Sequence, residues 1–135
     1  MLLETNRLVI LTLAEPKFDE DARTVVCVNG IFLKPDGITV KRLQRNPSLL
    51  SKLDSLIGQI SLGANGWIDY LILPKYQNNG YATEALESAK NFAIENHVEP
   101  FLAIDNDNIA SIAVAKKCGF KRIAGSATQG RYYVV

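Results

Sequence analysis

A short polar turn between two apolar runs has the composition of an anion-binding site. Residues 67–73 are expected to form a buried strand, and Pro74 ends it because proline lacks a backbone N–H. Gly80 permits a positive φ or a close approach of the backbone, and a helix is expected from Ala82. The amides of residues 78–83 would then point outward from the helix start, where unpaired N–H groups carry partial positive charge. Such a turn can bind a phosphate without a dedicated basic side chain.

A second group of polar residues stands at the start of another expected helix. Asn108 and Ser111 are three residues apart, and Lys117 precedes the pair Gly119-Phe120. Taken alone, Asn108 predicts a helix cap and Gly119 a left-handed helix exit before a core aromatic residue. The same polar side chains also have the reach to contact a ligand.

Together these two patterns resemble the signatures of the GNAT acyltransferases. The spacing Gln77-x-x-Gly80-x-Ala82 is similar to the acetyl-CoA pyrophosphate loop of that family, and residues 108–120 are similar to its second signature. The opening Glu-Thr-x-Arg-Leu at residues 4–8 resembles the ribosomal-protein N-acetyltransferase-like branch. The resemblance covers nearly the whole chain, is thinnest over residues 14–50, and implies acetyl-CoA as cosubstrate.

The resemblance also implies which residues contact the cofactor. Loop amides would bind the pyrophosphate, Asn108 would contact the pantetheine arm, and Ser111 would lie near the sulfur. A backbone N–H of residues 70–72 would meet the acetyl carbonyl and stabilise charge in the tetrahedral transition state, although ordinary ladder pairing of this strand is the alternative. The cofactor-binding residues implied are Tyr70, Leu71, Ile72, Gln77, Asn78, Asn79, Gly80, Tyr81, Ala82, Thr83, Asn108, Ser111 and Lys117.

Departures from the family pattern bear on the chemistry. Asn79 stands where many members carry Lys or Arg beside the phosphates, so cofactor affinity would rest more on backbone amides. Ala103 and Ala115 occupy the places of the family's Glu and Tyr acid/base pair. We therefore predict Asp69 as a substitute catalytic base and Ser111 as a substitute acid for the departing thiolate. The alternatives are that Asp69 faces solvent and that Ser111 only caps or packs.

These residues predict an N-acetyltransferase that passes an acetyl group directly from acetyl-CoA to a primary amine. The acceptor would be a protein or peptide N-terminus or a small amine, and the sequence does not identify it. A contrasting hypothesis is an acyl-CoA-binding sensor or scaffold module without turnover, which the missing acid/base pair favours.

The elements that must position these residues follow the order β-α-α-β-β-β-α-β-α-β-β. This order predicts an α+β protein with the GNAT fold, as a single domain over residues 1–135. Its mixed central sheet would contain a splayed parallel strand pair and carry helices on both faces. Strands are expected at 7–13, 48–53, 56–62, 67–73, 101–104, 120–124 and 131–135, and helices at 18–33, 38–45, 82–96 and from 108.

Composition limits which binding partners and which cellular compartment we expect. The formal net charge is +1 with no basic run, so we expect no nucleic-acid partner, and no apolar run is long enough to predict a membrane span. Cys27 and Cys118 lack Cys or His neighbours, so no metal site is expected and a cytoplasmic location is the default. His97 is expected at the surface or in a turn. The sequence is also compatible with a homodimer.

Overall fold

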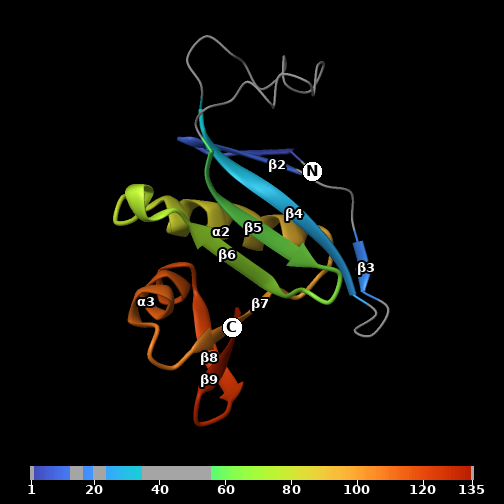
Figure 1. The fold of residues 1–135 in the computed structure, drawn as a ribbon. Helices are drawn as coiled ribbons and strands as arrows, with labels where there is room; N and C mark the ends of the chain where they lie inside the picture. Colours follow the sequence, from blue (N-terminus) through green and yellow to red (C-terminus); the bar gives the residue numbers. More distant parts are fainter. Residues whose placement is uncertain (1, 13–16, 20–23, 35–55, 135) are drawn as a thin grey trace.

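The computed structural model describes residues 2–12, 17–19, 24–34 and 56–134. Figure 1 shows two sheets with helices packed against them. The strands are β1 (Leu2–Glu4), β2 (Leu8–Thr12), β3 (Lys17–Asp19), β4 (Thr24–Leu33), β5 (Leu56–Gly63), β6 (Ile68–Ile72), β7 (Phe101–Asp105), β8 (Phe120–Gly125) and β9 (Gln129–Val134). The helices are the 3₁₀ turn η2 (Pro74–Tyr76), α2 (Tyr81–Glu95) and α3 (Ile109–Lys117).

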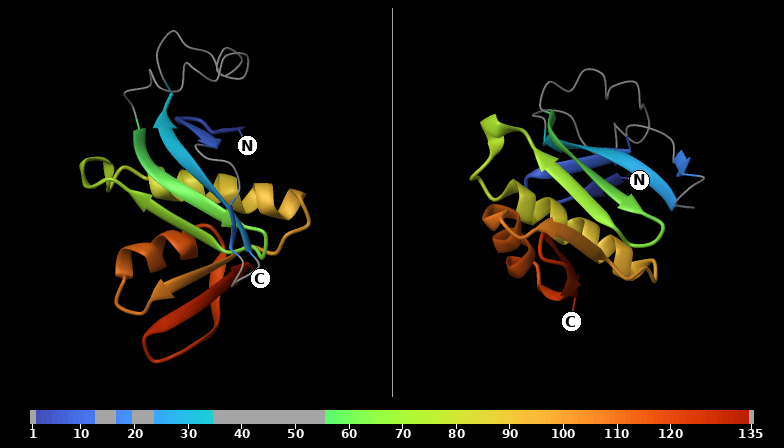
Figure 2. Two further views of the ribbon diagram at one scale, coloured as in Figure 1. Left: turned by 45° about the vertical axis from the view of Figure 1, so that its right-hand side comes forward. Right: turned by 60° about the horizontal axis from the view of Figure 1, so that its bottom comes forward.

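The larger sheet has the strand order β1-β2-β4-β5-β6, with β3 also paired to β4, and every pair is antiparallel. Helix α2 lies across one face of this sheet (Figure 2) and contacts β2, β5 and β6. It buries Ala85, Leu86, Ala89 and Ala93, which recur at helical spacing. Small alanines let the helix approach the strands closely, and complete burial of Leu86 contributes about 1.5–3 kcal/mol.

The smaller sheet has the order β7-β9-β8 and is also antiparallel. Helix α3 connects β7 to β8 and packs on both of these strands. It ends at a glycine in the left-handed region, Gly119 with φ +84°, as its position predicts. The next residue, Phe120, is fully buried and begins β8.

The two sheets meet at one parallel bridge, between Trp67 and Phe101. The Phe101 N–H donates to the Gly66 carbonyl at 2.9 Å. Beyond this point β6 continues beside β5 while β7 continues beside β9, so the neighbouring strands separate along their length. The expected splayed parallel pair is therefore confirmed, and the open edge of β6 faces the gap.

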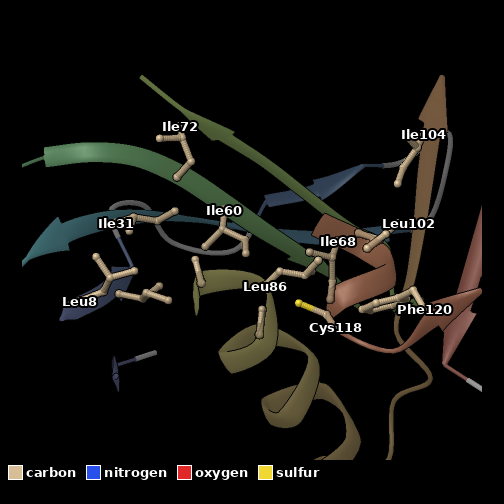
Figure 3. Packing of buried hydrophobic residues seen from close by; sticks show 14 of the residues in the cluster. Leu8, Ile31, Ile60, Ile68, Ile72, Leu86, Leu102, Ile104, Cys118 and Phe120 are labelled. Atoms are coloured by element: carbon tan, nitrogen blue, oxygen red, sulfur yellow. The ribbon is translucent and has the colours of Figure 1, made fainter. Parts of the chain in front are cut away.

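One buried core continues across both sheets (Figure 3). Ile60 and Ile72 contribute from the larger sheet, Leu86 from α2, and Leu102 and Phe120 from the smaller sheet. The same apolar cluster includes residues of both sheets and both helices. Its close packing fixes the position of β6 relative to β7, and so the separation of the two strands.

The predicted helix at residues 18–33 is wrong, because β3 and β4 occupy this stretch. Val25, Val26 and Val28 are β-branched and favour strand, and β4 pairs with β2 on one edge and β5 on the other. Acidic residues near position 19 are typical of a helix start, which is why the local pattern favours a helix here. The predicted helix at 38–45 and strand at 48–53 lie outside the described residues.

Among the described helices, none is both long and apolar enough to cross a membrane. Nor do the described residues bring three His, Cys, Asp or Glu side chains together in a group that could hold a metal ion.

Candidate active site

The polar turn is built as a tight loop between β6 and α2. Pro74 begins η2, and the chain then takes positive φ values at Asn78 (+65°) and Gly80 (+79°) before α2 starts at Tyr81. The positive φ expected at Gly80 is confirmed. Two left-handed residues in three reverse the chain sharply, so that the first amides of α2 follow the loop directly.

Side chains within the loop hold it closed. The Asn79 amide donates to the carbonyls of Tyr76 and Gln77 at 3.1 and 3.0 Å. The Gln77 amide donates to the Ile72 carbonyl at 2.9 Å and so ties the loop to the end of β6. Asn79, where a basic residue is common, therefore braces the turn from inside.

A cavity of about 650 Å³ runs from this loop to the gap between β6 and α3. It brings together every cofactor-binding residue predicted from sequence except Asn79. Four further lining residues escaped sequence reasoning, because only the packed position of η2 and the face of α3 reveal them. The lining residues are Tyr70, Leu71, Ile72, Tyr76, Gln77, Asn78, Gly80, Tyr81, Ala82, Thr83, Asn108, Ala110, Ser111, Ala113, Val114 and Lys117.

The edge of β6 turned away from β5 offers backbone groups to this cavity. The Leu73 N–H donates to the Ile57 carbonyl of β5 at 2.8 Å, and the Trp67 carbonyl accepts from Gly63 at 2.8 Å. Antiparallel pairing alternates, so the N–H and C=O of Tyr70 and Ile72 point to the opposite edge. The Ile72 carbonyl accepts a hydrogen bond from Gln77, and the backbone N–H and C=O of Tyr70 face the gap together with the Ile72 N–H.

Strand β5 packs closely against β6 at the same place. A side chain at Gly58 would put its Cβ 2.2 Å from the Leu71 carbonyl oxygen, and the β4–β5 register shifts between Ile31 and Phe32, opposite this residue. A glycine is therefore required at this position, because any side chain would collide with the neighbouring strand.

Asn108 and Ser111 meet Tyr70 across the gap. Asn108 caps α3, and its Oδ1 accepts from the Ser111 N–H at 3.1 Å, as its sequence position predicts. The Tyr70 hydroxyl oxygen is buried with no well-formed hydrogen bond in the described structure. Burial raises the pKa of this phenol, while the nearby Ser111 side chain acts in the opposite direction. The phenol therefore stays protonated at neutral pH.

A second cavity of about 540 Å³ adjoins the first and shares Tyr70, Asn108 and Ser111 with it. Asp69 is exposed and lines this second cavity together with Ser111, so the two predicted catalytic residues border the same space. Ala103, in the place of the family's Glu, lines it as well. Ala115, in the place of the family's Tyr, is instead fully buried in the core.

Two other residues singled out in the sequence lie away from both cavities. His97 is exposed in the turn after α2, with φ +60°, which agrees with its predicted turn position. Cys118 is buried, its Sγ lies 3.5 Å from the Thr83 carbonyl, and burial raises the pKa of its thiol to about 11. The thiol is therefore neutral and acts as a packing group.

The sequence matches the family model of the acetyltransferase (GNAT) domain over residues 38–121, more than half of the chain. This protein belongs to the GNAT acetyltransferase family. The family that the sequence patterns resemble is thus confirmed. Comparison with curated proteins gave no match.

Solved structures show the same GNAT fold. An acetyltransferase from Agrobacterium tumefaciens has a TM-score of 0.66 at 18% identity, covering 100% of this chain and 94% of its own. A ribosomal-protein-serine acetyltransferase-like protein from Vibrio cholerae has a TM-score of 0.61 at 16% identity, covering 98% and 95%. The microcin C7 self-immunity acetyltransferase MccE, solved with acetyl-CoA and AMP, has a TM-score of 0.58 at 19% identity. The similarity covers 86% of this chain but only 63% of the MccE chain, so this chain spans less than two thirds of that structure.

Proposed function

We propose that this GNAT protein transfers an acetyl group from acetyl-CoA directly to a primary amine. The observation that carries this proposal is the 650 Å³ cavity, which runs from the loop at Gly80 past the Tyr70 edge of β6 to Asn108 and Ser111. MccE, a protein of the same fold, was solved with acetyl-CoA. The pyrophosphate would bind the amides of residues 78–83, and the pantetheine arm would lie between β6 and α3.

The residues around the gap suit direct transfer. The backbone N–H of Tyr70 would donate to the thioester oxygen and stabilise the charge that develops as the amine attacks. Asp69, which lines the second cavity, would accept the amine proton through a water. Ser111 would donate its hydroxyl proton to the departing thiolate and would regain a proton from solvent. Holding amine and thioester in line removes an entropy cost of up to roughly 7–11 kcal/mol, and no covalent enzyme intermediate is needed.

The acceptor class follows from the weakness of this acid/base pair. Only a neutral amine attacks, and reference pKa values are about 7.7–8.0 for an α-amine and about 10.4 for lysine. At pH 7 about a tenth of the α-amine is neutral, but well under a thousandth of the lysine amine, a difference of roughly 3–4 kcal/mol. We therefore propose N-termini or other amines of low pKa as acceptors, rather than lysine side chains.

A second candidate function is acyl-CoA binding without turnover. Ala103 and Ala115 at the positions of the family's acid/base pair support it. Release of free thiol from acetyl-CoA, offered with peptides, polyamines, amino acids and aminoglycosides, separates the two functions. Turnover with any amine supports the enzyme, whereas tight CoA binding without turnover across this panel supports the binding module. Peptide acetylation confined to lysine side chains would refute the proposed acceptor class.

Calorimetric titration with acetyl-CoA tests the site itself. Gly80→Asp places a carboxylate among the loop amides, and like charges about 4 Å apart repel by about 4 kcal/mol near a protein surface, so binding should weaken at least about 100-fold. Gly119→Asp is the matched control, because Gly119 has a similar φ of +84° and open space around it but lines neither cavity. Equal affinity of the two folded variants would contradict the proposed phosphate loop.

A further inference from the structure

Arg7, in the turn between β1 and β2, reaches across the molecule to the first turn of α2. Its backbone N–H donates to Glu84 Oε2 at 2.9 Å, and its Nε donates to Glu84 Oε1 at 2.9 Å. The Thr5 hydroxyl also donates to Glu84 Oε2. Both carboxylate oxygens are therefore engaged, and the Glu84 side chain is only 19% exposed. This pairing fixes the guanidinium beside the loop.

The same guanidinium contacts three consecutive residues of the phosphate loop. Arg7 Nη1 donates to the Asn79 carbonyl at 3.0 Å. Arg7 Nη2 lies 3.4 Å from the point where a side chain at Gly80 would begin, and Arg7 Cζ lies 4.5 Å from the centre of the Tyr81 ring. A planar group with several donors can make these contacts at once, which a lysine ammonium cannot reproduce.

Two physical effects make this contact relevant to an anion. First, a loop that holds two residues at positive φ is costly to order, and contacts that order it before binding spare the ligand that cost. Second, Glu84 places a negative charge in the first turn of the helix whose N-terminus would bind phosphate, and Arg7 offsets that charge.

We propose that Arg7 is the positioning residue of the phosphate loop, which it orders from the turn between β1 and β2 through its own contacts and not by binding the phosphate. The proposal rests on the proposed function, since it concerns the same cofactor site. Arg7 lines neither of the two cavities described above. It acts through the Asn79 carbonyl, Tyr81 and Glu84, and it favours ligands that carry the diphosphate.

The test compares two ligands, CoA and S-acetylpantetheine, which lacks the diphosphate. Arg7→Met removes every side-chain contact, and a hydrogen bond to a charged group is worth about 1.5–3 kcal/mol, so CoA should bind about 10- to 100-fold more weakly. Affinity for S-acetylpantetheine should change by less than about 2-fold, because the arm site between β6 and α3 is left intact. In the free protein, amide hydrogen exchange of the loop at 77–83 should become faster.

Lys34→Met is the matched control. It breaks the ion pair between Lys34 Nζ and Glu4 Oε1, 2.7 Å apart, at the same end of the sheet, and should leave both affinities unchanged. If Arg7→Met does not fold, Arg7→Lys makes the same comparison with a loss of about 3-fold or more in CoA affinity, because the charge remains but the fixed set of donors is lost.

The two proposals fail in different ways. Absence of CoA binding by the wild-type protein would refute the proposed function. Wild-type binding of CoA, together with an unchanged ratio of CoA to S-acetylpantetheine affinity in the folded Arg7 variant, would overturn the positioning role alone. Equal loss of affinity for both ligands would also overturn it, because a general loosening of the fold does not discriminate between them.

Discussion

At the residue scale, the buried phenol of Tyr70 lies where the two cavities meet. Its oxygen has lost contact with water without gaining a well-formed hydrogen bond in the described structure. A buried hydroxyl without a hydrogen bond lowers the stability of the folded protein by about 1–3 kcal/mol. Such a group can persist at a site where it contacts a ligand. The Ser111 side chain lies close enough to influence the pKa of this phenol, and it stands on the wall where the thiolate is proposed to leave.

Tyr70→Phe should therefore slow acetyl transfer without lowering the free energy of unfolding. Removal of the hydroxyl should leave the free energy of unfolding unchanged or raise it by up to about 1 kcal/mol, because no well-formed hydrogen bond is lost. Acetyl transfer should slow by about 10-fold if the phenol supports proton donation from Ser111. Urea unfolding and thiol release measure the two effects. A loss of stability greater than about 1 kcal/mol would mean that the hydroxyl has a strong partner in the folded protein.

Asp69→Asn tests the proposed base. The variant should transfer acetyl groups about 10- to 100-fold more slowly at pH 7, and the deficit should shrink as the pH rises toward the pKa of the acceptor amine. At that pH the amine is already neutral and needs no base. Asp105→Asn removes a carboxylate from another wall of the same cavity and serves as control. A pH–rate profile equal to that of the wild type would exclude Asp69 as the base.

The residues that sequence predicted well are those whose roles are local. Gly80 and Gly119 were predicted from turn chemistry, and Asn108 from capping, because neighbours along the chain decide their conformations. Arg7 and the Tyr70 phenol were missed for the opposite reason. Arg7 lies 77 residues from Glu84, and only the folded sheet brings the two together.

At the element scale, the strands around the gap were predictable and the N-terminal half was only partly so. Strands β5 to β7 and helices α2 and α3 carry strong apolar patterns bounded by Gly, Pro or Asn. Most residues of β4 are apolar, and acidic residues at 19–21 precede it, a pattern that local signals cannot distinguish from a helix. Pairing with β2 and β5 decides its conformation, and such long-range pairing leaves little local signal.

Gly58→Ala should disturb the edge of β6. The added Cβ would lie 2.2 Å from the Leu71 carbonyl oxygen and 3.1 Å from the Ile72 Cα, so β6 must move away from β5. Forced overpacking costs about 1–3 kcal/mol in the free energy of unfolding, which urea titration measures. Acetyl transfer should fall as well, because the Tyr70 backbone shifts with the strand. Gln59→Ala, at an exposed neighbouring position of β5, should change neither property appreciably.

At the scale of the whole molecule, a few contacts join segments that are distant in sequence around the proposed site. The parallel bridge at Trp67 and Phe101 joins the two sheets at the base of the gap. The contact of Arg7 with Glu84 joins the N-terminal strands to the helix that follows the phosphate loop. The order of the loop therefore depends on the attachment of the chain's first residues to α2.

This dependence predicts how stability responds to acid. Partial burial alone would raise the pKa of the Glu84 carboxyl, but hydrogen bonds from Thr5 and Arg7, together with the Arg7 charge, hold that pKa below its ordinary value of 4.5. A carboxyl whose pKa is lower in the folded state contributes stability above its unfolded pKa and loses that contribution as the pH falls through the folded value. The contribution of Glu84 should therefore be complete at neutral pH, begin to fall near pH 4.5, and be absent once the carboxyl is protonated in both states.

Glu84→Gln isolates this contribution. The pair is partly exposed, with the Arg7 side chain 44% and the Glu84 side chain 19% accessible, so the expected difference in the free energy of unfolding at pH 7 is only about 1 kcal/mol. Urea unfolding of both proteins between pH 7 and pH 3 should show the two curves converging as the pH falls below 4.5, because a protonated Glu84 is nearly isosteric with glutamine. Glu87→Gln breaks the pair with Lys90 on the same helix and should show a smaller difference at pH 7, because the Glu87 side chain is 45% accessible and its charge is better solvated. If the Glu84 variant differs from the wild type by the same amount at pH 3 as at pH 7, then shape rather than charge at this position ties the N-terminal strands to the loop.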